Sequence, residues 1–414
     1  MASEHDILEH VFNKFLQGPH IFKDREVLRP DYIPEHLPHR EDQIQRIGGI
    51  LAPTLKESRS SNIFIYGKTG TGKTAVIKYI LDHLLRKGRE VGAPIEACYV
   101  NCRIAGTDYR VLAQLGEGVK VEIPFTGLAT GEVFDRFKVG LEARPCLLIV
   151  ILDEIDALVK ARGDILLYEL TRVNEGLRHS RVSLIGISND LHFKDLLDPR
   201  VLSSLSEEEV VFRPYSAPEL LDILSERARL GFVDGVLAAG TLNLCAALAA
   251  AEHGDARRAL DLLRVAGELA EREGVMRVTE DHVRWAQEKI EEDRVVLVLK
   301  TLPLHSKLVL VSAYVMKREN VKGMITGDIY EVYKELCGRL GVDPLTQRRV
   351  SGLINELDVV GLLNARVVSL GRYGRTKRVR LGVARSAVRE VYAEDAWVGQ
   401  LIDYAPKCLS KRRS

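Results

Sequence analysis

A glycine-rich run, Gly67–Thr74 with the sequence GKTGTGKT, carries the clearest chemical signal in the chain. It fits the pattern G-x-x-x-x-G-K-[ST] and lies between an apolar stretch and a helical pattern, as phosphate-binding loops do. Glycines let backbone N–H groups converge on phosphates, and the following helix adds the positive end of its dipole. In such a loop Lys73 reaches the β- and γ-phosphates, and the Thr74 hydroxyl binds Mg²⁺. The predicted nucleotide contacts are Gly70, Thr71, Gly72, Lys73 and Thr74.

Two carboxylates follow the apolar run Leu147–Leu152, and an asparagine follows the next apolar run, Arg181–Ser188. In open α/β sheets, ligands bind at the edge where the strands have their carboxyl ends. Asp153 is therefore predicted to bind Mg²⁺, directly or through water, and Glu154 to orient and activate the attacking water. The side-chain amide of Asn189 can hold the same water or the γ-phosphate, although Asn-Asp is also a common turn sequence.

Alternating strand and helix patterns surround these residues. The predicted strands are Asn62–Tyr66, Ile95–Asn101, Leu147–Leu152, Arg181–Ser188 and Glu209–Phe212. Helical periodicity marks Gln43–Glu57 and the segment from Thr74 to about Lys87. This alternation implies a parallel sheet with right-handed crossovers. After Pro218 the strands stop, and an all-helical domain is predicted from Glu219–Leu230, Leu237–Ala251, Asp255–Glu273 and Thr279–Glu292.

A third unit is predicted to begin near Val295. Helical patterns at Ser306–Lys317, Gly327–Leu340 and Thr346–Leu357 are followed by two β-rich stretches, Ala365–Leu370 and Thr376–Leu381. Three helices and then a glycine-turned hairpin is the order of a winged helix-turn-helix. The third helix is the candidate recognition helix, because a helix in the major groove contacts bases and phosphates with its N-terminal residues. Those residues are Thr346, Gln347, Arg348 and Arg349.

The predicted hairpin is strongly basic. Residues 359–389 contain eight Arg and Lys side chains and no acid, in a chain whose net charge is only +1. A projecting β-ribbon with arginine at its tip can enter a minor groove. The predicted contacts of this wing are Arg372, Tyr373, Arg375, Lys377 and Arg378. A solvated basic face, or a winged helix that contacts protein, is the alternative interpretation.

The composition excludes several classes of protein. The 414 residues are 46% hydrophobic and 28% charged, and 59 Lys and Arg balance 58 Asp and Glu, which excludes a uniformly basic nucleic-acid coat. Six cysteines are too few for a disulfide scaffold, and Cys98 and Cys102 are expected to be buried thiols rather than metal ligands. The longest apolar run, Leu244–Ala251, is far shorter than the ~20 residues of a membrane span. The N-terminus does not resemble a secretory signal, so a cytoplasmic location is expected.

Taken in order, these residues resemble the AAA+ ATPase superfamily. Flanking motifs narrow the resemblance to the archaeal origin-recognition/cell-division-control (Orc/Cdc-type) replication initiators. It extends from about Asp31 to Leu381, far beyond the phosphate loop that many ATPases share. The motifs that carry it are Leu37–Glu41 (LPHRE), Pro124–Gly127 (PFTG), Pro199–Ser204 (PRVLSS), Gly254–Leu260 (GDARRAL), Arg348–Gly352 (RRVSG) and Gly371–Arg375 (GRYGR).

This resemblance implies roles for further residues. Asn189 is similar in place to the first sensor, and Arg257, rather than its neighbour Arg258, to the second sensor, which touches the γ-phosphate. Arg200 is similar in place to the arginine finger, which acts on a neighbouring subunit. The implied adenine-pocket residues are Pro38, His39 and Arg40, and the implied lid-side nucleotide contacts are Tyr215 and Arg227. The stretch Arg103–Gly131 resembles an initiator-specific insertion that presents backbone to DNA.

The resemblance implies an AAA+ α/β core with a helical lid and a C-terminal winged helix. The expected divisions are an arm (1–36), the core (37–216, with the insertion at 103–131), the lid (217–293), the winged helix (294–385) and a C-terminal helix with a basic tail (386–414). The implied cofactors are ATP or ADP and Mg²⁺, with slow, switch-like hydrolysis. The implied partners are duplex origin DNA, the replicative helicase and further copies or paralogues, in a nucleoid-associated cytoplasmic protein. A clamp-loader or helicase-loader ATPase and an ATP-sensing winged-helix transcription regulator are the alternatives.

Overall fold

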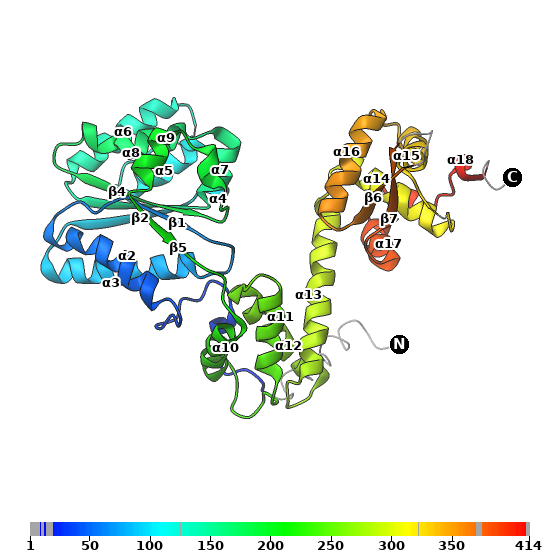
Figure 1. The fold of residues 1–414 in the computed structure, drawn as a ribbon, viewed down its shortest axis with the longest axis horizontal. Helices are drawn as coiled ribbons and strands as arrows, with labels where there is room; N and C mark the ends of the chain where they lie inside the picture. The colour runs from blue at the N-terminus through cyan, green and yellow to red at the C-terminus, as the bar shows by residue number, and fades with distance from the viewer. Residues whose placement is uncertain are drawn as a thin grey trace. The chain divides into compact units, whose positions relative to one another are not determined.

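The computed structural model describes Glu9, Phe12, Asn13 and residues 20–124, 126–321, 323–369 and 375–410. The chain forms two compact units, residues 1–286 and 287–414 (Figure 1). The long helix α13 (Glu280–Thr301) contains this division, so the predicted helix Thr279–Glu292 is too short at its C-terminal end. Among the described residues, none of the helices is both long and apolar enough to cross a membrane.

The first unit contains a five-stranded parallel sheet. Its strands are β1 (Ile63–Tyr66), β2 (Ile95–Asn101), β3 (Leu147–Asp153), β4 (Arg181–Ser188) and β5 (Glu208–Val211). Each lies within one residue of its predicted position at either end, because apolar runs between polar flanks mark buried strands well. The order β2-β3-β4-β1-β5 places β4 between β1 and β3. The carboxyl ends of these strands therefore lie side by side.

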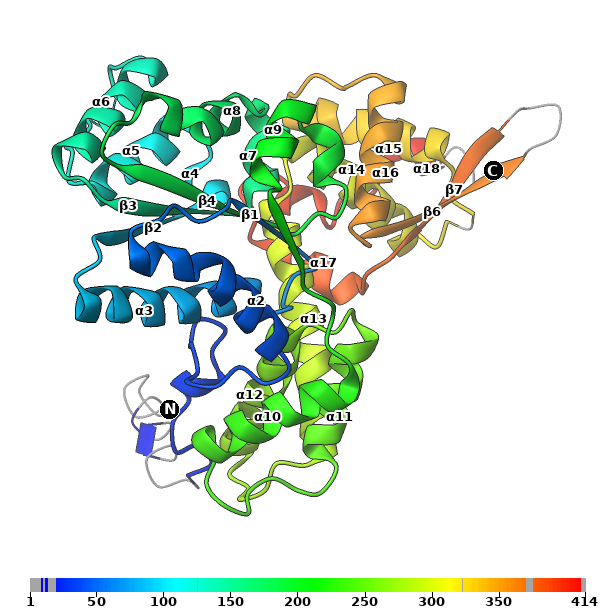
Figure 2. The same ribbon diagram turned by 60° about the vertical axis from the view of Figure 1, so that its left-hand side comes forward.

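Helices cover both faces of this sheet. Figures 1 and 2 show α2 (Glu41–Leu51) and α3 (Lys73–Val91) on one face and the helices between β2 and β5 on the other. The latter are α4 (Cys102–Ala105), α5 (Asp108–Gly118), α6 (Thr130–Ala143), α7 (Ile155–Arg162), α8 (Ile165–Arg172) and α9 (Pro199–Leu205). All seven residues of β3 are buried, as expected for a strand covered on both faces. Cys98 and Cys102 are buried free thiols in this core.

The lid consists of helices and a segment from the N-terminal arm. Its helices are α10 (Ala217–Gly231), α11 (Thr241–Ala251), α12 (Ala256–Glu273) and the beginning of α13. The arm crosses α10 at η1 (Glu26–Leu28), where the Phe22 and Phe232 ring centroids lie 4.8 Å apart and the Lys23 amide donates to the Gly231 carbonyl. The arm is thus part of the lid's packing from residue 20 onward.

The second unit has the order predicted for a winged helix-turn-helix. Its elements after α13 are α14 (Leu304–Arg318), α15 (Thr326–Leu340), α16 (Gln347–Val359), the antiparallel pair β6 (Leu363–Ser369) and β7 (Arg375–Leu381), α17 (Arg385–Ala393) and α18 (Lys407–Ser410). Thr346 caps α16 by accepting a hydrogen bond from the Arg349 amide. The turn between the strands, with the predicted contacts Arg372 and Tyr373, lies outside the described residues, as does the side chain of Arg375.

Candidate functional site

The glycine-rich loop encloses the ammonium group of Lys73. This Nζ donates to the carbonyls of Gly67 and Lys68, each at 2.7 Å, and Lys73 is only 5% exposed. Burial lowers the pKa of Lys73 to about 8, nearby Arg257 acts in the same direction, and Asp153 opposes both. A phosphate group close to this ammonium would restore the charged form.

Asp153 is hydrogen-bonded to Thr74, the last residue of the glycine-rich loop. Its Oδ2 accepts a hydrogen bond from the Thr74 hydroxyl at 2.7 Å, and its Oδ1 accepts one from the Glu154 amide at 2.8 Å. A buried carboxylate beside a hydroxyl is a hard-oxygen donor set of the kind that binds Mg²⁺ with a nucleotide. Thr74 and Asp153 therefore fit the metal that the sequence implies.

Glu154 occupies an unusual backbone conformation. Its φ is +51°, in the left-handed region that non-glycine residues rarely adopt and that recurs at functional sites. Its carboxylate lies 3.7 Å from the guanidinium of Arg103, which is itself highly exposed. The conformation turns the backbone at the end of β3, and Glu154 lines the cavity described below.

Asn189 is held by the first turn of α7, the helix that follows β3. The carboxylate of Asp156 accepts hydrogen bonds from the backbone N–H of Asn189 at 3.2 Å and from the Ser188 hydroxyl at 3.1 Å. This contact fixes the end of β4 relative to the end of β3. Asp156 was not among the predicted site residues, although its place three residues after Asp153 was a usable signal.

A cavity of about 400 Å³ brings most of the predicted nucleotide residues together. It is lined from one side by the glycine-rich loop and β3, and from the other by the arm and the lid. The predicted residues that line it are Pro38, Gly70, Thr71, Gly72, Lys73, Thr74, Asp153, Glu154, Asn189, Tyr215, Arg227 and Arg257. Lys78, Tyr99, Asn101 and residues 29–34 also line it and were missed.

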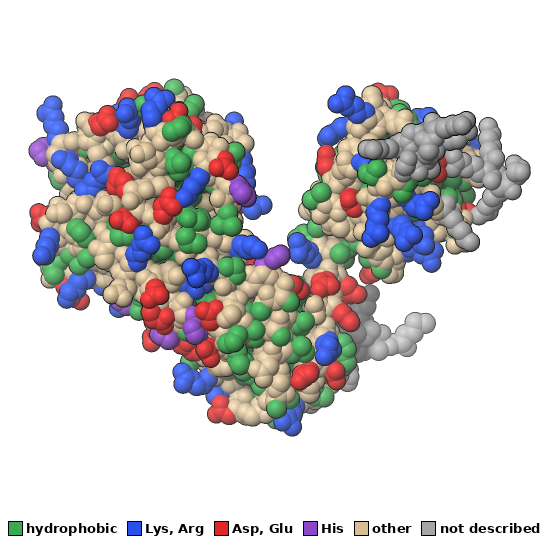
Figure 3. All heavy atoms as spheres, in the orientation of Figure 1, with side chains coloured by type: hydrophobic (Ala, Val, Ile, Leu, Met, Phe, Trp, Pro, Cys, Tyr) green, Lys and Arg blue, Asp and Glu red, His purple; other side chains and the backbone are tan. Residues whose placement is uncertain are grey.

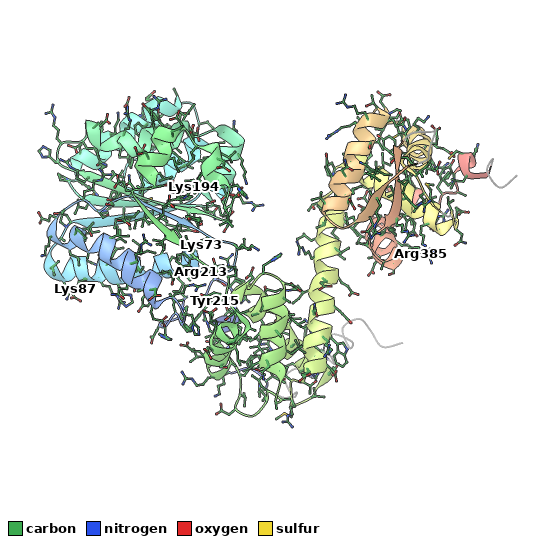
Figure 4. All side chains as sticks on the ribbon, in the orientation of Figure 1. Lys73, Lys87, Lys194, Arg213, Tyr215 and Arg385 are labelled. Atoms are coloured by element: carbon green, nitrogen blue, oxygen red, sulfur yellow. The ribbon has the colours of Figure 1, made fainter. Side chains whose placement is uncertain are left out.

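Two predicted adenine-pocket residues do not line the cavity. Arg40 is buried behind the loop, where it donates to the carbonyls of Thr71 at 3.0 Å and Arg213 at 2.8 Å and lies over the Tyr215 ring at 3.7 Å. Figure 4 shows Lys73, Arg213 and Tyr215 close together where the sheet meets the lid. His39, with φ +62°, instead places its Nε2 atom 2.9 Å from a carboxylate oxygen of Asp222 in α10. Arg40 therefore braces the loop rather than walling the cavity.

The lid contacts the glycine-rich loop directly at the start of α12. The Ala256 amide donates to the Gly70 carbonyl at 3.1 Å, and a Cβ atom at Gly70 would meet the Asp255 carboxylate at 1.7 Å. Arg257 lines the cavity, whereas Arg258 pairs with Glu252 at 2.9 Å. The two adjacent arginines therefore lie in different surroundings, and the second-sensor role of Arg257 stays a prediction.

Arg227 is oriented by the arm. Its guanidinium donates to the carbonyls of Val27 at 3.0 Å and Tyr32 at 3.4 Å and lies 4.5 Å from the Tyr32 ring centroid. Burial lowers the pKa of Arg227. Its hydrogen bonds therefore hold the arm against the lid at the wall of the cavity.

Arg200 lies outside the cavity. Its side chain is 72% exposed and forms two hydrogen bonds with Asp198, at 3.1 and 3.2 Å. The guanidinium also lies 5.7 Å from the Tyr168 ring centroid. Arg200 is thus an oriented surface cation and is not among the residues that line the cavity.

The two faces of the β6–β7 hairpin in the second unit differ in their contacts: one packs toward α16 and the other is exposed. Lys377 hydrogen-bonds Asn355 of α16, and Val379 on the same face is fully buried. Arg366 and Arg378 are direct cross-strand neighbours on the opposite face, where Arg380 is also exposed. The predicted wing contacts Lys377 and Arg378 therefore point in opposite directions, because successive strand residues alternate.

The exposed face carries uncompensated charge. We call Arg366, Arg378 and Arg380 the outer arginine face, and none of the three forms an ion pair within the described parts of the chain. Figure 3 shows Lys and Arg side chains gathered over β7 and α17, where Figure 4 labels Arg385. On α16, Arg349 lies 3.4 Å from Glu356, and Arg348 is exposed. Like charges placed directly opposite in a sheet are unfavourable unless an anion neutralises them.

Comparison with protein families matches three consecutive parts of the chain. Residues 36–185 match the AAA ATPase domain, residues 221–288 the Cdc6 AAA+ ATPase-type lid domain, and residues 297–391 the CDC6 C-terminal winged helix domain. The AAA+ core, helical lid and winged helix are therefore established as the fold.

Curated relatives and solved structures agree over nearly the whole length. The chain is 54% identical to an ORC1-type DNA replication protein of Thermococcus onnurineus, with 94% of each chain covered, and 52% identical to that of Thermococcus kodakarensis, with 99% of each covered. The Aeropyrum pernix ORC1 protein, solved in complex with DNA, is 50% identical with a TM-score of 0.84, covering 92% of this chain and 99% of its own. The chain therefore belongs to the archaeal ORC1-type DNA replication proteins, of the Orc/Cdc6 branch of AAA+ ATPases.

Proposed function

We propose that this chain is an ATP-dependent initiator that binds duplex origin DNA through its winged helix and uses its nucleotide state as a switch. The observation that carries the proposal is the contact between α12 and the glycine-rich loop at one wall of a cavity lined by Lys73, Asp153 and Arg257. The outer arginine face and the Aeropyrum pernix relative solved with DNA support the DNA-binding part.

In this proposal, the loop amides and Lys73 hold the β- and γ-phosphates, and Thr74 and Asp153 hold Mg²⁺. The metal neutralises charge on the phosphate oxygens when it is bound. Glu154 accepts a proton from water while the water oxygen bonds to the γ-phosphorus and the bond to the ADP oxygen breaks. Asn189 orients this water, and the fixed position of the β4 end supports that role.

The proposed switch depends on the γ-phosphate being contacted by both the core and the lid. Lys73 begins α3 of the core, whereas Arg257 is in the first turn of the lid helix α12. A γ-phosphate between them links core to lid, and its loss leaves Arg257 without that anion. The lid then relaxes relative to the core, which alters how the initiator holds DNA and recruits the replicative helicase.

DNA is held by the second unit. The N-terminal residues of α16 enter the major groove, where Arg348 or Arg349 contacts guanine or phosphate. Arg200 acts on ATP bound by a further copy or a paralogue on the same DNA, and its exposure supports this role. Such a protein works in the cytoplasm, associated with the nucleoid.

DNase footprinting on genomic fragments tests the proposal against its alternatives. Protection should fall at replication origins and should change between ATP and ADP. Protection confined to promoters would favour a transcription regulator, and binding without sequence preference would favour a loader.

A further inference from the structure

Asp153 receives a hydrogen bond that the phosphate-loop chemistry does not require. Besides Thr74, the hydroxyl of Tyr99 donates to Asp153 Oδ2, also at 2.7 Å. With the Glu154 amide on Oδ1, three donors fix a carboxylate that is only 5% exposed. A carboxylate with this number of directed donors has one preferred orientation.

Tyr99 reaches Asp153 because of the strand register. Asn101, the last residue of β2, pairs with Asp153 in β3, and Tyr99 precedes it by two residues on the same side of the sheet. The ring is 38% exposed at the cavity wall, and the Lys78 ammonium lies 5.1 Å from its centroid. A tyrosine hydroxyl carries its proton at neutral pH, so the phenol is the donor in this hydrogen bond.

We propose that Tyr99 is a positioning residue that orients Asp153 for Mg²⁺ bound with the nucleotide. The phenol occupies one lone pair of Oδ2 and prevents rotation of the carboxylate about its χ2 angle. Partners that orient a metal-binding carboxylate typically contribute 10- to 100-fold to metal affinity or activity. This assignment rests on the proposed nucleotide site, and it concerns the metal rather than the phosphates.

A merely structural role for Tyr99 makes a different prediction. If the ring only packs against Lys78 and β3, its hydroxyl contributes nothing to the metal. Tyr99→Phe keeps the ring and removes the hydroxyl, so it separates the two roles. Nucleotide binding without metal depends on the loop and Lys73, which this variant leaves unchanged.

The experiment measures the affinity of the full-length chain for a fluorescent ADP analogue in EDTA and across an Mg²⁺ titration. Tyr99→Phe should bind the analogue in EDTA within about twofold of the parent, while the Mg²⁺ concentration for half-saturation rises by about 10-fold. In an Asp153→Asn background the same substitution should have no further effect, because Tyr99 acts through Asp153.

Tyr404→Phe is the matched control, since Tyr404 donates to the carboxylate of Glu335 at the same 2.7 Å in the other unit. It should leave the Mg²⁺ titration unchanged. An unchanged titration for Tyr99→Phe would overturn the assignment, and so would an equal loss of affinity in EDTA and in Mg²⁺. If the parent itself binds no nucleotide under either condition, the proposed function fails and this assignment fails with it.

Discussion

The nucleotide cavity and the outer arginine face differ in whether their charged side chains have partners within the chain. In the cavity, Lys73 is satisfied by loop carbonyls and Asp153 by three donors. On the hairpin, Arg366 and Arg378 are cross-strand neighbours, and neither forms an ion pair with an acid among the described residues. A preformed, internally compensated site favours tight binding of a small ligand, because little reorganisation is needed. An uncompensated cationic surface favours a long polyanion whose binding releases counterions.

Removal of the proposed base should produce the largest effect. Glu154→Gln keeps the shape and the Asp153 contacts but cannot accept a proton, so steady-state ATP hydrolysis should fall by about 10²–10⁴-fold. ATP affinity should stay close to that of the parent, as measured by filter binding. Hydrolysis at the parental rate would remove Glu154 from this role. Lys73→Ala serves as the comparison, because it should lose nucleotide binding itself.

Neutralisation of the outer arginine face should give the next largest effect. If each arginine contacts one phosphate, the triple change of Arg366, Arg378 and Arg380 to Gln should reduce the slope of log K against log salt by about 2.7. Origin and scrambled duplexes should weaken alike. Lys377→Gln, on the opposite face of the same strand, where the side chain hydrogen-bonds Asn355 of α16, is the control and should change the slope much less. A salt slope that stays the same in the triple variant would show that this face does not contact DNA.

Replacing Arg348 or Arg349 tests whether α16 reads bases or contacts only phosphates. If either side chain reads a base, its replacement by Ala should cost about 1–3 kcal/mol on the origin duplex and less on the scrambled one. Competition binding with the two duplexes measures the difference. A uniform loss on both would assign these arginines to phosphates.

The titration of Lys73 should give the smallest effect. Burial lowers its pKa to about 8, and bound phosphates favour the ammonium form, so binding takes up a proton above that pH. ADP affinity should be nearly constant below pH 8 and should fall as pH rises further, by at most about 10-fold per unit. Lys73→Arg, which stays charged, should show no such fall, as isothermal titration calorimetry at several pH values can measure. A parental affinity that is flat up to pH 9.5 would contradict the role of this ammonium.

The sequence predicted backbone elements better than side-chain directions. The strands were predicted from apolar runs and the phosphate-binding loop from glycine spacing. Both are local patterns that do not depend on how the rest of the chain packs. The Tyr99–Asp153 hydrogen bond joins residues 54 positions apart and depends on the register of β2 and β3, which no local pattern determines. His39 and Arg40 were expected at the adenine pocket and do not line the cavity, and no local pattern marks the left-handed backbone at His39. The opposite faces of Lys377 and Arg378 were predictable from strand alternation once the hairpin was recognised.

In the proposed mechanism, the bound nucleotide controls how this chain holds origin DNA. The most direct measurement is the affinity of the full-length protein for an origin duplex with ATP and with ADP, for the parent and for Lys73→Ala. The parent should have different affinities with ATP and with ADP, and the variant should have a single, nucleotide-independent affinity. Identical affinities with ATP and ADP in the parent would contradict it.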